Sequence, residues 1–194
     1  MRDLADAAFP LVAPLPRVAD NPYILRVRGG SITTLGLKTV YGPAMLNDVY
    51  NTRILELAGN IPRIGRLAAP DATATAHSKL CGSTVTVDIK MRGGVVTDFA
   101  HEVKACALGQ ASSSIMARNV IGAGTEELRE VRETVRRMLK ENGAAPAGKW
   151  EDVKVLEPVR DYKARHASTL LTFDAVISAI SQIEAEGSAE AQAI

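Results

Sequence analysis

The stretch that decides the fold is residues 81–106, CGSTVTVDIKMRGGVVTDFAHEVKAC. Its first half alternates hydrophobic with polar residues, which is the period-two pattern of a half-buried β-strand. The polar positions are Thr84, Thr86, Asp88 and Lys90, and the hydrophobic positions are Val85, Val87, Ile89 and Met91. Gly93–Gly94 supplies a turn and Val95–Val103 a returning strand. The pattern predicts an antiparallel hairpin with Cys81 at its entry and Cys106 at its exit.

Helices are expected before and after this hairpin in the sequence, because hydrophobic or small residues recur in those segments at helical spacing. The expected helices cover, in order, residues 46–57, 110–121, 126–141 and 168–185. Thr125 is the expected N-cap of the third helix, and Gly187 follows the last one. A short strand within Ala72–Lys79 would add a third strand to the hairpin. The sequence therefore predicts an α+β fold, with a small antiparallel, about three-stranded sheet packed against helices.

The composition excludes several classes of protein. The 194 residues carry 23 Lys and Arg against 22 Asp and Glu, and 4% are aromatic, so neither charge nor stacking platforms favour nucleic acid. No stretch approaches the roughly 20 apolar residues that span a membrane, and the acidic, proline-interrupted N-terminus does not resemble a signal peptide. We therefore expect a cytoplasmic protein that binds neither nucleic acid nor membrane.

The first 44 residues differ from the rest in composition. They are rich in proline at their start and offer one weak hairpin candidate over residues 24–35. Either this segment is an accessory extension, or Met45 is the working start of the protein. The expected organisation is an N-terminal extension over 1–44, a domain over 45–186 and a flexible tail over 187–194.

The two cysteines are the main candidates for chemistry. Two thiols cannot make a disulfide scaffold or a four-cysteine metal site within one chain. Antiparallel pairing brings the entry and exit of a hairpin together, so Cys81 and Cys106 are expected to face one point at the end of the sheet. Cys106 also precedes a helix, whose positive N-terminal end favours the thiolate form. The alternative is that both cysteines are small buried hydrophobic residues.

Three histidines could add a nitrogen ligand. Strand alternation places His101 on the apolar face with Val95 and Phe99, which favours a buried core histidine. His77 lies four residues before Cys81 and could reach the same region. His166 could supply the ligand that two cysteines lack, provided that the last helix starts beside the end of the hairpin.

Four short segments carry a resemblance to a known family. They are Asn60-Ile61-Pro62-Arg63-Ile64-Gly65, Cys81-Gly82-Ser83, Cys106 with the Ala/Ser-rich segment after it, and Ser168-Thr169-Leu170. In this order they resemble motifs of the U-type iron–sulfur cluster assembly scaffolds: IscU, SufU and the N-terminal domain of NifU. The resemblance extends from Asp48 to about Ile180 and implies the SufE/NifU-like fold.

The chain departs from the family pattern at three positions. Where the family has an aspartate and a third cysteine, this chain has Ser83 and Ser168, and the position of the IscU histidine is Ala167, beside His166. A serine hydroxyl is a poor ligand for iron–sulfur clusters and zinc, which favour thiolate and imidazole. Either a histidine joins the two cysteines, a second subunit contributes, or binding is weak and transient.

The resemblance implies a scaffold protein rather than a turnover catalyst. Cys81 and Cys106 would hold iron or a transient cluster of the 2Fe–2S type, with zinc as the alternative metal. Ser83 and Ser168 would line the cluster site, and His166 would be a third metal ligand. The implied partners are a cysteine desulfurase, recipient apo-proteins and a second copy of the chain. Two alternatives stay open: a zinc-dependent or metal-free sulfur-relay protein, and a regulatory homologue that has lost metal binding.

Overall fold

The computed structural model describes residues 51–192, with side chains described through Ala189. The expected hairpin over residues 24–35, the first turns of the expected helix 46–57 and the question of Met45 lie outside the described residues. None of the described helices is long and apolar enough to cross a membrane.

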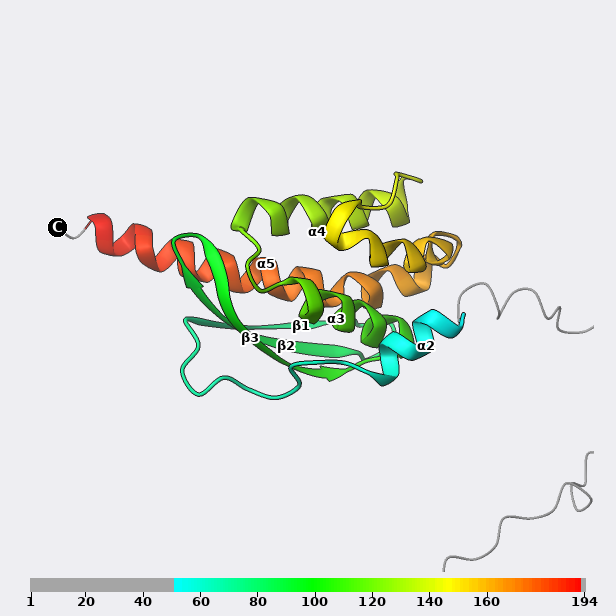
Figure 1. The fold of residues 1–194 in the computed structure, drawn as a ribbon, viewed down its shortest axis with the longest axis horizontal. Coiled ribbons are helices and arrows are strands. Elements are labelled where there is room, and N and C mark those ends of the chain that lie inside the picture. The colour runs from blue at the N-terminus through cyan, green and yellow to red at the C-terminus, as the bar shows by residue number, and fades with distance from the viewer. Residues whose placement is uncertain (1–50, 193–194) are drawn as a thin grey trace, which may run out of the picture. The chain divides into compact units, whose positions relative to one another are not determined.

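A three-stranded antiparallel sheet forms the centre of the fold (Figure 1). Its strands are β1 (Ala72–His77), β2 (Thr84–Arg92) and β3 (Val95–Lys104), in the spatial order β1-β2-β3. The predicted hairpin and the short first strand are therefore confirmed, together with the α+β class.

The register of the hairpin contains a β-bulge. Lys90 pairs with Asp98, whereas Met91 pairs with Val96, so that Thr97 is the extra residue on β3. The alternation of faces shifts by one position there, and Val96 is 1% exposed while Val95 is 38% exposed. The expectation that Val95 shares the apolar face with Phe99 was wrong, because simple alternation does not anticipate a bulge.

The helices lie mainly on one side of the sheet (Figure 1). They are α2 (Thr52–Gly59), α3 (Ala107–Asn119), α4 (Thr125–Lys140), the 3-10 helix η2 (Gly148–Asp161) and α5 (Lys163–Gln192). α5 contacts β1, β2 and α3, and α4 packs on α5 and η2. The N-cap of α4 is Gly124 rather than the expected Thr125, which is the first helical residue.

The last helix is longer than the sequence predicted. It begins at Lys163, five residues before the expected start, and it continues through Gly187 to Gln192. A glycine inside a helix costs roughly 1 kcal/mol relative to alanine, which weakens a helix without ending it. The prediction that Gly187 ends the helix was therefore wrong.

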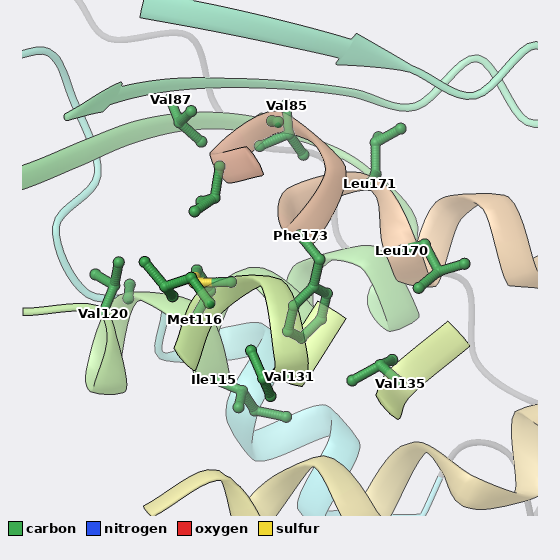
Figure 2. Packing of buried hydrophobic residues seen from close by; sticks show 14 of the residues in the cluster. Val85, Val87, Ile115, Met116, Val120, Val131, Val135, Leu170, Leu171 and Phe173 are labelled. Carbon is green, nitrogen blue, oxygen red and sulfur yellow. The ribbon is translucent and has the colours of Figure 1, made fainter. Parts of the chain in front are cut away.

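One continuous hydrophobic core joins the sheet to the helices (Figure 2). Phe173 of α5 lies between the sheet residues Val85 and Val87 and the residues of α3 and α4, and it is fully buried. The apolar side of α4 faces this core, and its five hydrophobic residues there are buried: Leu128, Val131, Val135, Met138 and Leu139. Burying a side chain such as Phe contributes about 1.5–3 kcal/mol, so this core is the main support of the site at its edge.

Candidate functional site

Three elements meet at the site. Cys81 lies in the connection between β1 and β2, Cys106 is the N-cap residue of α3, and Ser168 lies in the second turn of α5. Both cysteines are free and partly exposed. Neither cysteine is fully buried, although Cys106 packs partly against the hydrophobic core.

Cys81 is surrounded by serine hydroxyls. Its thiol donates to Ser78 Oγ at 3.3 Å, and its Sγ lies 3.0 Å from Ser83 Oγ. Two backbone bonds close the turn that holds these groups, from Ser78 N to Ser83 O at 2.8 Å and from Gly82 N to Ser78 O at 2.9 Å. Gly82 has φ +67°, a conformation that a glycine adopts without strain.

These hydroxyls favour the ionised form of the thiol. Hydrogen bonds from Ser78 and then Ser83 lower the pKa of Cys81 to about 7, against the smaller opposing effect of desolvation, and Ser168 contributes in the same direction. A thiol with this pKa is about half ionised at neutral pH, and the thiolate is the form that attacks sulfur and binds metal.

Ser168 is a shared neighbour of the two cysteines. Cys106 Sγ donates to Ser168 Oγ at 3.6 Å, and Ser168 also contributes to the lowered pKa of Cys81. Ser168 Oγ itself donates to Arg165 O at 3.0 Å. The structure thus brings together four of the five residues expected at the site: Cys81, Ser83, Cys106 and Ser168.

A glycine in α3 allows this close approach. A Cβ atom at Gly109 would lie 2.8 Å from Ala105 Cβ and 3.1 Å from Ser168 O. Any larger residue would push α5 away from α3, and with it the hydroxyl that touches Cys106.

His166 does not join the two cysteines. Its side chain is buried, with Nε2 at 3.2 Å from Val159 O and 3.0 Å from Arg160 O, both in the final turn of η2. Within residues 51–192 no group of three or more His, Cys, Asp or Glu side chains is placed to hold a metal ion. The expected set of Cys81, Cys106 and His166 is therefore not assembled here.

The other two histidines bond with groups other than the thiols. His77 Nδ1 lies 3.1 Å from Thr84 Oγ1 on the exposed side of the sheet. His101 is fully buried, Nε2 donates to Pro62 O at 3.0 Å, and desolvation lowers its pKa. The prediction of a core histidine at position 101 is confirmed.

His101 anchors the Asn60–Gly65 segment to β3. Gly65 N donates to His101 O at 2.9 Å, and His101 N donates to Arg63 O at 3.1 Å. Arg63 has φ +59°, and its Nε donates to Ala117 O at 3.1 Å, which ties the same segment to α3. These contacts show that the motif residues position the segment against β3 and α3.

Two polar residues were missed by the sequence analysis. Ser78, a partner of Cys81, is 2% exposed, and only its position three residues before the cysteine could have indicated it. Asp88 was expected on the solvent side of β2 but is fully buried, with its carboxylate accepting from Arg66, Thr73 and Leu67 N. The segment before β1 covers that side of the sheet, which alternation in one strand cannot show.

The donor set suits a loosely held soft metal. Two thiols with three hydroxyls around them provide two good ligands, whereas a permanent zinc or iron–sulfur site uses four. The partly exposed sulfurs leave access for an external ligand or a reacting sulfur atom.

Comparisons with known proteins identify relatives of the whole domain. The chain is 29% identical over 137 residues to the iron–sulfur cluster assembly scaffold protein IscU of Thermotoga maritima, which covers 70% of this chain and 94% of the relative. The crystal structure of the N-terminal part of a nitrogen-fixing NifU-like protein from Brucella abortus is 74% identical, with a TM-score of 0.72. That match covers 73% of this chain and 98% of the Brucella chain.

A more distant structure shares the fold alone. The SUF-system scaffold candidate FiSufU from Fervidobacterium islandicum AW-1 is 20% identical, with a TM-score of 0.64 over 69% of this chain and 97% of its own.

Residues 49–169, which contain both cysteines and Ser168, match the family described as the NifU-like N terminal domain. The chain therefore belongs to the NifU-like N-terminal domain family.

Proposed function

We propose that the protein is an iron–sulfur cluster assembly scaffold whose Cys81 and Cys106 bind the cargo. The observation that carries this proposal is that Ser168 contacts the Cys106 thiol and also helps to lower the pKa of Cys81, at the site where three elements of a NifU-like domain meet. The cargo is iron or a nascent 2Fe–2S cluster, and zinc is the alternative metal.

The cysteines and the serines would have different roles in binding this cargo. Cys81 and Cys106 supply the two soft ligands, and the hydroxyls of Ser78 and Ser83 stabilise the Cys81 thiolate before the cargo arrives. Ser168 replaces a third thiolate with a neutral hydroxyl. With two strong ligands, binding is weak and release to an acceptor is easy, which is what a scaffold needs.

This role implies partners on both sides of the cargo. A cysteine desulfurase in the cytoplasm would supply sulfur, and recipient apo-proteins would remove the finished cluster. The protein would carry the cluster rather than turn over a substrate, and a second copy of the chain could complete the ligand set.

Anaerobic reconstitution tests the proposal. The full chain is incubated with ferrous iron and sulfide, and bound iron and sulfide are measured per chain together with the native mass. We expect both elements to bind and to be lost in Cys81→Ser and Cys106→Ser, while Ser181→Ala, an exposed serine of α5, binds as the wild type. A wild-type protein that binds neither iron nor sulfide would contradict the scaffold role.

The lowered pKa of Cys81 favours a second candidate, a sulfur relay. The Cys81 thiolate would attack the outer sulfur of a persulfide on a desulfurase cysteine. A new S–S bond forms on Cys81, the S–S bond of the donor breaks, and the desulfurase cysteine leaves as its thiolate. Mass spectrometry after incubation with desulfurase and cysteine would then show one added sulfur atom on Cys81 without bound iron.

A further inference from the structure

α3 and α5 lie side by side and run in the same direction (Figure 1). Both start at the thiol site, where Cys106 at the start of α3 contacts Ser168 of α5. Both lead toward the turn of the β2–β3 hairpin. The residues after α3 bond with Val96, and Glu184 of α5 pairs with Arg129 in the first turns of α4, which begins at that turn. Positions one helical turn beyond the Cys106–Ser168 contact therefore lie opposite each other.

Small polar residues fill the interface between these two helices, which we call the α3–α5 seam. Its closest approach is at Gly109, where a Cβ atom would lie 3.1 Å from Ser168 O. Residues four positions apart lie on the same face of a helix. Ser113, four residues after Gly109, and Thr172, four residues after Ser168, therefore face each other across the seam. Both are buried, with exposed fractions of 0% and 1%.

Neither of these two hydroxyls has a hydrogen-bond partner among the described residues. The neighbouring buried hydroxyls behave differently, because Ser112 and Thr169 each donate at 3.0 Å to a carbonyl oxygen of their own helix. A buried hydroxyl without a partner has lost its hydration without replacement, which is rare in folded proteins unless an ordered water supplies the bond. Two such hydroxyls at facing positions indicate one small ligand shared by Ser113 and Thr172.

We propose that one internal water molecule bridges Ser113 Oγ and Thr172 Oγ1 within the α3–α5 seam. Water is the smallest ligand that can both donate and accept, and a buried water typically forms about three hydrogen bonds. Ser168 O, one turn before Thr172, can accept the third, because a carbonyl oxygen has a second lone pair beside its helical bond. This hydration site would lie one helical turn below the contact between Ser168 and Cys106, away from solvent.

Substitutions that remove one hydroxyl each test the bridge in the full chain. Thr172→Val keeps the shape of the side chain and should lower the melting temperature by about 2–4 °C, because the bridge is lost and Ser113 stays buried without a partner. In the Thr172→Val background, Ser113→Ala should have at most about half of its effect in the wild type. Ser112→Ala is the matched control. It removes an equally buried hydroxyl whose bond stays within α3, so its effect should add to that of Thr172→Val.

Nuclear magnetic resonance separates a bridging water from a direct bond between the two hydroxyls. A water held in the seam should give cross-relaxation peaks from the solvent resonance to protons of Ser113 and Thr172. Thr172→Val should abolish these peaks and Ser112→Ala should keep them. The proposal is overturned if Thr172→Val raises the melting temperature, if its effect and that of Ser113→Ala simply add, or if the two are coupled without the solvent peaks. Iron takes no part in these measurements, so they do not depend on the scaffold role.

Discussion

Cys81 is held by neutral hydroxyl groups rather than by a cation. Ser78 and Ser83 bond with its sulfur, Ser168 adds to the lowering of its pKa, and no lysine, arginine or histidine contributes. Hydroxyl groups can donate to a thiolate, and they can rotate away or accept when the sulfur bears a proton or a metal. The site therefore activates the sulfur without adding a positive charge that would repel a metal cation.

This environment predicts the pH dependence of Cys81 alkylation. In a Cys106→Ser background, the rate of reaction with iodoacetamide should rise with pH and reach half its maximum near pH 7, because only the thiolate reacts. Ser83→Ala removes one donor and should move the midpoint upward, toward the ordinary cysteine value of about 8.5. The control Ser181→Ala should leave the midpoint unchanged. An unchanged midpoint in Ser83→Ala would show that its hydroxyl does not stabilise the thiolate.

Replacing Ser168 with cysteine should increase the affinity of the site for zinc. Ser168→Cys places a third thiol near the other two, since Ser168 Oγ lies 3.6 Å from Cys106 Sγ and Ser168 affects the pKa of Cys81. Zinc affinity, measured by competition with a chromophoric chelator, should rise at least about tenfold, because zinc prefers thiolate to hydroxyl. Ser181→Cys gives the same number of cysteines at an exposed position on α5 and should not change the affinity. Equal gains in both variants would indicate non-specific binding by added thiols.

At the scale of elements, Gly109 controls the distance between α3 and α5. Gly109→Ala would place a methyl group 3.1 Å from Ser168 O and should reduce the free energy of unfolding by about 1–3 kcal/mol. It should also weaken iron binding, because the shift moves Ser168 away from Cys106. Chemical denaturation and iron titration measure the two effects.

Gly187 is the matched control for this substitution. It lies in α5 and nothing stands within 4 Å of its would-be Cβ, so Gly187→Ala should stabilise the protein by up to about 1 kcal/mol. Iron binding should not change. If Gly109→Ala is as well tolerated as Gly187→Ala, then the close contact of α3 and α5 does not position Ser168.

The Asp88 carboxylate, which links β2 to the segment before β1, should make the stability of the fold sensitive to acid. Burial raises the pKa of Asp88, but hydrogen bonds from Arg66, Thr73 and Leu67 N outweigh it, so the net shift is downward. The carboxylate therefore stabilises the fold above the ordinary aspartate pKa of about 3.9, and this contribution is lost as the pH falls through the lowered folded-state value.

The matching variant is Asp88→Asn. At neutral pH it should lower the free energy of unfolding by about 2–4 kcal/mol, because a buried set of donors loses its charged acceptor. The difference from the wild type, followed by urea denaturation across acidic pH, should shrink below about pH 4. Asp98→Asn, at an exposed position on β3, should show no such trend. A difference that is constant with pH would contradict the assignment.

The elements with a clear period could be predicted, and the irregular ones could not. The hairpin and α4 show strict patterns of two and 3.6 residues, and both formed where expected. The 3-10 helix η2 was missed, although its buried residues recur at every third position: Trp150, Val153, Leu156 and Val159. Because η2 was missed, His166 was wrongly expected to be a metal ligand. η2 ends where α5 begins, and the carbonyl oxygens of its last turn accept the hydrogen bonds of the His166 ring.

At the scale of the whole molecule, the site and the hydrophobic core found within residues 51–192 share one stretch of sequence. The buried hydrophobic residues extend from Ile54 to Ile180, and all residues around the two thiols lie between these limits. The fold class and the positions of both cysteines could be predicted because the motifs keep their order along the sequence. The contacts of Ser78 and His166 could not be predicted. They depend on the orientation of the turn before Cys81 and of the first turn of α5.

This distribution predicts the effect of shortening the chain. A protein that begins at Met45 should keep its melting temperature within about 2 °C and bind as much iron as the full chain. A protein that begins at Ala72 loses Ile54 and Leu57 from the core and should melt at a clearly lower temperature. Calorimetry and iron analysis measure both outcomes. An unchanged melting temperature with reduced iron binding in the Met45 chain would give residues 1–44 a part in the function.

The presence of a serine rather than a cysteine at position 168 also limits the products that oxidation can form at the site. Three cysteines at one site can pair in three ways, whereas the two cysteines of this chain can form a single intramolecular disulfide. Oxidation to a disulfide within one chain therefore has one product, and a dithiol reductant that cleaves it restores the original site without reshuffling. In the proposed scaffold, the serine that would weaken metal binding would thus also simplify recovery from oxidative damage.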